Sequence, residues 1–206
     1  MKVERLVLGP IDTNCWLVSD GAGGPLIVID PAGDAPLLLD AVGDSPVEAV
    51  VLTHAHFDHL GAVRALMEAT GAPLMVHRLD ADAAADPSRN LADMIGEELC
   101  TPMADRILED GDEVRAGGVT LRVLLTPGHT PGSICLYAPG HLISGDTLFA
   151  GSVGRTDLPG GDARALAASI REKLAGLPDD TRVHPGHGDE TTIGRERMRN
   201  IFWPRS

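Results

Sequence analysis

Four apolar runs in this chain, each with the composition of a β-strand, end in a short turn that carries histidine or aspartate. The runs are VEAVVLT (47–53), LRVLLTPG (121–128), HLISG (141–145) and TRVHPG (181–186). The side chains that follow them are His54, His56, Asp58, His59, His129, Asp146 and His187. Strand ends on one rim of a sheet are a common place for an active site. We therefore expect a fold that brings four strand ends, and these seven side chains, to one place.

The seven side chains divide into the ligand sets of two neighbouring metal ions. The first set has three imidazoles and the second has one carboxylate and two imidazoles, which gives His54, His56 and His129 in the first and Asp58, His59 and His187 in the second. Asp146, with two carboxylate oxygens, can bridge them. Two such ions, about 3.5–4 Å apart, generate a hydroxide nucleophile at neutral pH and polarise the carbonyl that it attacks. Asp58 and Asp146 are the candidate catalytic carboxylates.

Each of these residues also has an ordinary structural interpretation. Asp58 could be the N-cap of a helix that begins at His59. His54 and His56 could be core histidines with hydrogen bonds to the backbone. All seven side chains lie at strand ends, however, and this shared placement favours the metal centre.

Strand-like and helix-like segments alternate along the chain, which predicts an α/β fold with helices packed outside two sheets. Strands are expected at 2–8, 14–18, 25–31, 47–54, 72–77, 119–127, 133–139, 141–146 and 181–185. Helices are expected at 34–44, 59–71, 162–178 and 192–202, with Gly71 as a C-cap. Residues 78–104 are either a lid over the site or a helical excursion packed on the sheet. We expect a single domain spanning residues 1–206.

The charge and composition exclude several classes of partner. The formal net charge is −13, and phosphate contacts need clustered Lys and Arg, so we expect no nucleic-acid partner and no anionic membrane partner. No apolar stretch reaches the roughly 18 residues of a membrane span, and the N-terminus has no signal-like apolar region. A cytoplasmic location is expected. Cys15, Cys100 and Cys135 are expected to be buried free thiols.

The motifs THAHFDH (53–59), TPGHT (126–130), SGDTLF (144–149) and PGHG (185–188) together resemble the metallo-β-lactamase superfamily. The resemblance implies a four-layer αββα sandwich with a dinuclear site on one edge, and it assigns the same two ligand sets and the same bridging Asp146. Within that superfamily, residues 144–162 and 184–200 resemble the short bacterial hydrolases related to glyoxalase II, the hydroxyacylglutathione hydrolases. Because all ligands are nitrogen or oxygen, zinc is the expected metal, with iron or manganese as alternatives.

The chain departs from glyoxalase II in two places. It ends 19 residues after His187, so we expect no C-terminal glutathione-binding helical domain. The family holds the carboxylate of the thiol with a Lys and a Tyr in the loop after the bridging aspartate. Here Arg155 stands in the Lys place and Asp157 in the Tyr place, and an arginine can still bind a carboxylate bidentately. The expected reaction is hydrolysis of a small acyl thioester by a metal-bridging hydroxide, with Arg155 in substrate binding.

Other activities compete with this interpretation. A persulfide dioxygenase of the same fold has a GRTD-like loop and uses one iron, and the PGHG motif favours the hydrolase over it. A hydrolase of the same fold acting on another ester, a lactone or an amide is a further alternative. The C-terminal arginines 195, 197, 199 and 205 could form an anion platform, although a solvated helix face is the favoured interpretation.

Overall fold

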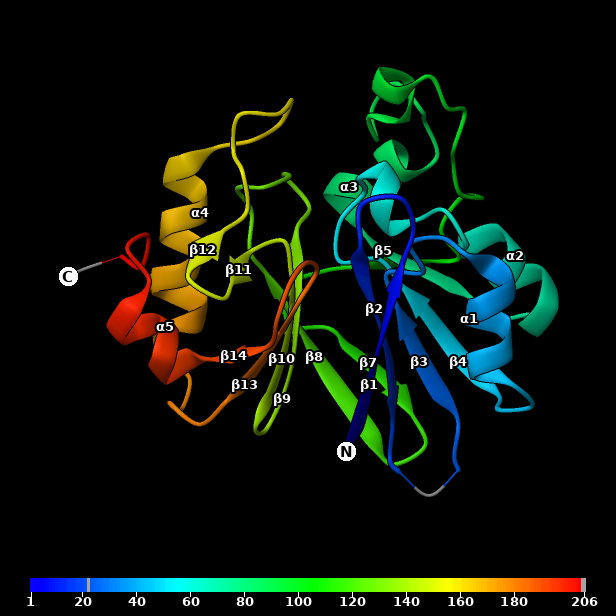
Figure 1. Cartoon of the computed structure of the whole chain (residues 1–206), viewed down its shortest axis with the longest axis horizontal. Coiled ribbons are helices and arrows are strands. Elements are labelled where there is room, and N and C mark those ends of the chain that lie inside the picture. Colours follow the sequence, from blue (N-terminus) through cyan, green and yellow to red (C-terminus); the bar gives the residue numbers. More distant parts are fainter. Residues whose placement is uncertain (22, 205–206) are drawn as a thin grey trace.

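Two six-stranded sheets face each other at the centre of the molecule, and helices cover the outer face of each (Figure 1). The computed structural model describes residues 1–21 and 23–204. The first sheet has the order β1(Lys2–Leu8), β2(Thr13–Ser19), β3(Leu26–Ile29), β4(Val47–Val51), β5(Leu74–His77), β6(Arg106–Leu108). The second has the order β14(Thr191–Thr192), β13(Arg182–Pro185), β10(His141–Gly145), β9(Ile134–Ala138), β8(Val119–Leu125), β7(Glu113–Ala116). This is the predicted four-layer αββα sandwich.

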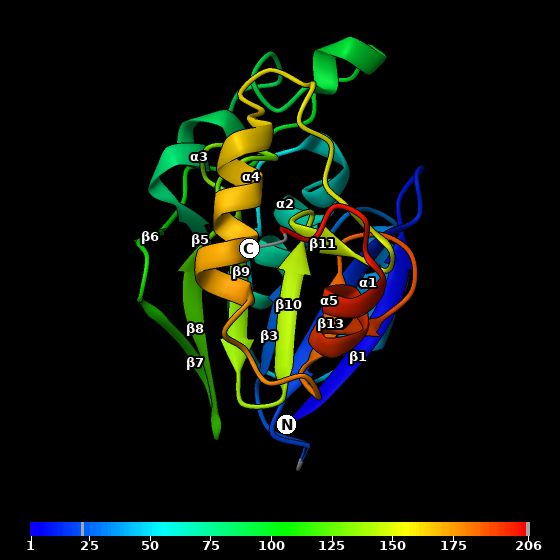
Figure 2. The same cartoon turned by 90° about the vertical axis from the view of Figure 1, so that its left-hand side faces the viewer.

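The helices form the two outer layers (Figure 2). Beside the first sheet lie α1(Ala35–Val42), α2(Val63–Thr70) and α3(Arg78–Ala84). Beside the second lie α4(Ala163–Ser169), which continues as a π-helical turn over Ile170–Leu174, and α5(Ile193–Arg199). A small hairpin, β11(Leu148–Phe149) and β12(Ser152–Val153), and two 3₁₀ turns, Phe57–His59 and Ala92–Ile95, complete the described elements.

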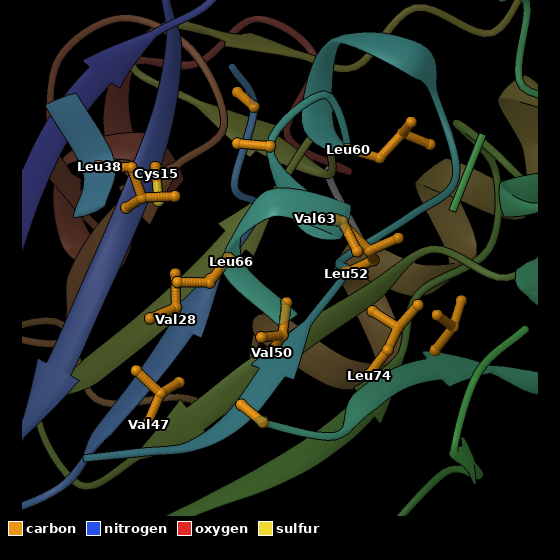
Figure 3. Packing of buried hydrophobic residues seen from close by; sticks show 14 of the residues in the cluster. Cys15, Val28, Leu38, Val47, Val50, Leu52, Leu60, Val63, Leu66 and Leu74 are labelled. Atoms are coloured by element: carbon orange, nitrogen blue, oxygen red, sulfur yellow. The ribbon is translucent and has the colours of Figure 1, made fainter. Parts of the chain in front are cut away.

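Side chains of the inner strands alternate between two cores, because successive residues of a strand point to opposite faces of the sheet. Val28 and Val50 belong to the buried cluster under α1 and α2, where Leu38 and Leu66 also lie (Figure 3). Val51, the next residue along β4, belongs instead to the cluster between the two sheets. A third cluster lies under α4 and α5. The continuous apolar runs of the sequence are therefore strands buried on both faces.

Strand direction places the predicted site. β8 and β10 are both antiparallel to β9, and β13 is parallel to β10, so these three strands of the second sheet run the same way. Their carboxyl ends therefore lie on one rim, which the end of β4 in the first sheet faces.

Two details differ from the sequence prediction. The helix expected at 59–71 begins only at Val63, with Ala62 at its N-cap position, so Asp58 does not cap it. Its predicted C-cap is confirmed, since Gly71 has φ 71° and its N–H donates to the Met67 carbonyl. Strands β6, β7, β11, β12 and β14 were not predicted, because runs of two to four residues are too short to show a period.

The thiols agree with the sequence prediction in two cases of three. Cys15 and Cys135 are buried and free, whereas Cys100 is free but only half-buried.

Among the described residues, no helix is both long enough and apolar enough to cross a membrane.

The core between the sheets should dominate stability. Leu121 is fully buried there, and Leu121→Ala should lower the free energy of unfolding by about 2–5 kcal/mol, because the cavity left behind does not fully collapse. Leu37 on α1 is 53% exposed, and Leu37→Ala should change that free energy by less than about 1 kcal/mol. Urea denaturation of both variants measures the difference. Similar losses in the two variants would contradict this account of the core.

Candidate metal centre

The structure brings all seven predicted side chains together at the rim where the strand ends meet. Three overlapping groups have ligand atoms within 4.8 Å of one another. They are His54, His56 and His129; His54, His59 and Asp146; and Asp58, His59 and His187. The first and third groups are the two ligand sets predicted from the sequence. The predicted proximity is therefore confirmed, whereas the role of each residue as a metal ligand remains a proposal.

The first set is a tight group of imidazoles. His56 Nδ1 lies 2.9 Å from His129 Nε2, which lies 3.2 Å from His54 Nε2. Burial, together with the neighbouring imidazoles, lowers the pKa of His56 to about 3 and holds the pKa of His54 well below its usual value. Both rings are therefore neutral at physiological pH, and the neutral imidazole is the form that binds a metal.

The second set surrounds Asp58. Its Oδ2 atom lies 3.3 Å from His59 Nε2 and 3.2 Å from His187 Nε2. Burial alone would raise the pKa of Asp58, but the nearby His59 and the hydrogen bond with His187 lower it well below its usual value. Asp58 is therefore a carboxylate at any physiological pH.

Asp146 contacts members of both sets. Its Oδ1 lies 3.5 Å from His59 Nε2, and its Oδ2 lies 3.6 Å from both His129 Nε2 and His187 Nε2. The carboxylate therefore lies between the two sets, with Oδ2 equally near to one histidine of each, where two ions could share it.

Two buried atoms at the centre have no hydrogen-bond partner, namely His59 Nε2 and Asp146 Oδ1. Buried polar atoms are normally paired, so each such atom needs an explanation. Burial would lower the pKa of His59, but Asp58, Asp30 and Asp146 together raise it well above its usual value. The carboxylates at this point therefore favour a positive charge, and the donor set fits divalent cations.

A cleft of about 570 Å³ opens over the cluster. His56, Asp58, His129, Asp146 and His187 line its floor. The predicted substrate residue Arg155 lies on its wall, and its guanidinium donates two hydrogen bonds, of 2.8 and 2.9 Å, to the carboxylate of Asp157. The cleft therefore gives a small molecule access to the cluster.

Comparison with known proteins identifies the family. The model of the metallo-β-lactamase superfamily matches residues 8–187. The chain belongs to the metallo-β-lactamase superfamily. It is 40% identical to the probable metallo-hydrolase YqgX of Bacillus subtilis, over 98% of this chain and 97% of that protein. It is 33% identical to the hydroxyacylglutathione hydrolase GloC of Haemophilus influenzae, over 98% of both chains. It is accordingly a metal-dependent hydrolase of this superfamily.

Solved structures of superfamily members overlay closely on the chain. BLEG-1, a B3 metallo-β-lactamase, matches with a TM-score of 0.92 and 38% identity over 98% of this chain and 99% of its own. TTHA1623, solved in a di-iron-bound form, matches with a TM-score of 0.83 and 42% identity over 97% and 100%. ETHE1 of Myxococcus xanthus matches with a TM-score of 0.80 and 32% identity over 98% and 84%.

The sequence prediction missed several residues that hold the seven side chains of the cluster in place. Asp30, directly after β3, accepts hydrogen bonds from the Thr53 N–H and hydroxyl, both 2.7 Å, and its Oδ2 lies 3.0 Å from His59 Nδ1. This contact directs His59 Nε2 into the cluster. Asp30 also follows an apolar run, so the strand-end rule that selected the other residues would have found it.

Asp80 on α3 joins two of the turns that carry the histidines. Its carboxylate accepts hydrogen bonds from the Ala55 N–H, the Thr130 hydroxyl and the Gly132 N–H, at 3.0, 2.7 and 2.7 Å. No local sequence pattern marks this role, because its partners lie 25 to 52 residues away.

The turn that carries His187 is fastened by residues of the opposite sheet. Asn14 donates to the carbonyls of Pro185 and Gly188, both at 2.9 Å, and Trp16 Nε1 donates to the Pro185 carbonyl at 3.1 Å. On the other side of the cluster, His129 Nδ1 lies 2.8 Å from the Arg155 carbonyl oxygen, which directs Nε2 inward. A hydrogen bond to the ring nitrogen that does not face the metal orients a metal-binding histidine in this way.

The other three histidines of the chain lie outside the three groups. His77 caps α3 by accepting a hydrogen bond from the Leu79 N–H. His141 and His184 contact each other, with Nδ1 of one 2.9 Å from Nε2 of the other. Arg197 binds Asp179 and donates to the carbonyls of Ala175 and Leu177 after the π-helical turn, so this one of the C-terminal arginines has structural contacts. Residue 205 lies outside the described residues.

The backbone at Gly186 comes close to the cluster. A Cβ atom there would lie 2.1 Å from Asp146 Oδ1 and 2.8 Å from His59 Cε1. Gly186→Ala should therefore displace Asp146 and weaken metal binding by roughly tenfold to 100-fold, the usual cost of disturbing the groups that position metal ligands. Metal titration of the purified variant measures this loss.

The matched control is Gly176→Ala, because a Cβ at Gly176 meets nothing within 4 Å. This variant should bind metal as the wild type does. Wild-type metal affinity in Gly186→Ala would show that Asp146 is not fixed in the position described.

Proposed function

We propose that this chain is a thioester hydrolase of the hydroxyacylglutathione hydrolase type that works with two divalent metal ions. The observation that carries the proposal is Asp146, which lies at the floor of an open cleft with His129 of the first set and His59 and His187 of the second within 3.6 Å of its oxygens. A site for one ion would need only histidines and Asp146, and it would leave the rest of the second set without a ligand role. The match to GloC supports the substrate class, and the di-iron form of TTHA1623 supports the two-ion stoichiometry.

Each ligand set would hold one ion, with Asp146 shared between them. Zinc is the proposed metal, with iron or manganese as alternatives. When bound, such a pair of ions lowers the pKa of a water to give a nucleophile near neutral pH and polarises the carbonyl of the substrate. No separate general base is then required from the protein, and among the described residues the floor of the cleft offers only the ligand side chains themselves.

The residues of the chain would keep the ligands in the right protonation state and give the substrate a water-poor cleft. Burial keeps His54 and His56 neutral and ready to bind, so no proton has to leave them first. Asp58 is already ionised. The apolar walls of the cleft would exclude bulk water from the thioester, which strengthens the electrostatic interactions inside. A carboxylate on the thiol carrier would have Arg155 as its cationic partner, although it would have to displace Asp157.

Two other activities have specific support. The similarity to BLEG-1 favours hydrolysis of a cyclic amide, in which the same carbonyl chemistry would open a β-lactam ring. The similarity to ETHE1 is the observation in favour of the dioxygenase alternative. That alternative needs one ion held by histidines and an aspartate, so it leaves the second ligand set without a purpose.

Asp58 separates the two-ion proposal from the one-ion alternative. Asp58→Ala removes the anionic member of the second set and should empty that site, while the first set stays intact. Loss of one metal from the reacting centre should cost about 3–4 kcal/mol of transition-state stabilisation, which lowers kcat by roughly 10²–10³. The measurement is metal content and thioesterase rate on the same folded variant.

Asp82→Ala is the matched control, because its side chain is 75% exposed on α3, and it should keep both metals and the full rate. Wild-type metal content and rate in Asp58→Ala would overturn the role of the second set.

The activity itself is tested with metal-loaded protein and three reagents. We expect hydrolysis of S-lactoylglutathione, detected by release of free thiol, with a kcat that Asp58→Ala lowers by roughly 10²–10³. A higher kcat/KM on a β-lactam would make the amide hydrolase the better assignment. Oxygen consumption with a persulfide, in place of thioester hydrolysis, would favour the dioxygenase.

A further inference from the structure

The walls of the cleft over the metal centre are almost entirely apolar. Apart from the five cluster residues on its floor, ten side chains line it, and eight of those ten are hydrophobic. The hydrophobic ones are Ile11, Phe57, Leu91, Met94, Ile95, Phe149, Val153 and Leu158. Ser152 and Arg155 are the two polar ones. A ligand that fills this space would therefore meet mainly hydrocarbon.

Three of these side chains project into solvent at the mouth of the cleft. Ile11 is 51% exposed, Met94 is 68% exposed and Ile95 is 50% exposed. Large apolar side chains gathered at the edge of a concave site are typical of ligand-binding surfaces, because a bound ligand removes them from water. Their position directly beside the cluster indicates that the ligand is the substrate of that centre.

One side of the cleft is a wall built from Leu91, Met94 and Ile95, which we name the 91–95 wall. It follows α3 and extends beyond the sheets at the same end of the molecule as the loop before α4 (Figure 1). The wall is held to the cluster, since the Phe57 N–H donates to the Asn90 carbonyl at 2.9 Å. The buried Asn90 side chain also binds the Leu99 carbonyl and the Ala92 N–H, at 2.8 and 2.9 Å.

Leu91 itself has a left-handed backbone, with φ 72°. A branched residue avoids this region, and such strain persists only where surrounding contacts impose it, often at ligand sites. The hydrogen bonds of Asn90 impose it here and set Leu91 among the lining side chains. The position of the 91–95 wall is therefore fixed by the hydrogen bonds of Asn90 and by the backbone of Leu91.

The charged side chains of the cleft also favour an apolar substrate. Arg155 is the single Lys or Arg among the described residues that line the cleft, and Asp157 already occupies its guanidinium in a bidentate pair. A glutathione thioester carries carboxylates, and to bind the one cation in this cleft they would have to displace Asp157, its partner in an exposed ion pair. A neutral, apolar substrate meets no such cost.

We propose that the preferred substrate is a thioester with an apolar acyl chain of several carbons and an uncharged thiol portion next to the sulfur. This inference rests on the proposed thioesterase activity and narrows its substrate class. The acyl chain would lie along the 91–95 wall, with the carbonyl over the floor of the cleft. Each buried methylene contributes about 0.8 kcal/mol, which corresponds to roughly fourfold in kcat/KM.

The test is a series of N-acetylcysteamine thioesters with acetyl, butyryl and hexanoyl groups, beside S-lactoylglutathione, on the metal-loaded protein. We expect kcat/KM to rise by roughly 15-fold from butyryl to hexanoyl, as two buried methylenes imply, and to exceed the value for S-lactoylglutathione. The double variant Met94→Ser, Ile95→Ser should lose this dependence on chain length, so that its ratio of kcat/KM for hexanoyl to butyryl falls toward one. The control Met198→Ser, at a 77% exposed position on α5 outside the cleft, should behave as the wild type.

Arg155→Ala provides an independent measurement, because the substitution keeps the backbone carbonyl that contacts His129. We expect KM for S-lactoylglutathione to change by less than threefold. A rise of tenfold or more would show that Arg155 binds a substrate carboxylate and would overturn the inference.

The remaining outcomes separate the two proposals. Faster hydrolysis of S-lactoylglutathione than of every neutral thioester, or a flat response to chain length in the wild type, would overturn this inference and leave the thioesterase proposal standing. An absence of hydrolysis on all four thioesters by metal-loaded protein would remove both.

Discussion

The buried carboxylates Asp58 and Asp146 lie where the two sheets meet, and they need positive charge beside them. Removing an unpaired ionised group from water costs several kcal/mol, so such a group is paired or binds a metal. His59 lies between them, and its Nε2 atom has no hydrogen-bond partner. The turns at the ends of β4, β8, β10 and β13 are all arranged around this requirement, and cations at the centre would join the two halves of the sandwich.

The hydrogen bonds that orient the histidines of the cluster come from both halves of the sandwich. Asp30 and Thr53 belong to the half that carries His59, whereas the Arg155 carbonyl orients His129 from the other half. Asn14, in β2 of the first sheet, holds the turn of His187 from the second. Because the first half also holds the turn of His187 in the second, movement between the sheets would disturb the position of this histidine.

Much of the fold and of the cluster could be predicted from the sequence, for identifiable physical reasons. The apolar runs show which strands are buried, and the turns after them carry His54, His129 and Asp146 at positions that parallel strand ends bring together. Local pattern could not reveal Asp80 and Asn14, since their hydrogen bonds join residues 25 or more positions apart. It also suggested Asp58 as a cap for a helix that in fact begins four residues after His59.

The predicted role of Arg155 illustrates a different limit. Its place in the chain suggested a partner for a substrate carboxylate, but only the three-dimensional structure shows that Asp157 already binds its guanidinium. The apolar lining of the cleft likewise depends on four separate segments that meet only in the folded chain. The positions of the ligand-type side chains are thus readable from short motifs, whereas the lining that a substrate would meet is visible only in the folded chain.

The central claim is that two ligand sets share Asp146 and hold two ions. Anomalous diffraction from crystals grown with the bound metal, recorded on both sides of its absorption edge, tests this directly. The account predicts two peaks about 3.5–4 Å apart, one beside His54, His56 and His129 and the other beside Asp58, His59 and His187, with Asp146 between them. A single peak, with the second set unoccupied at saturating metal, would contradict it.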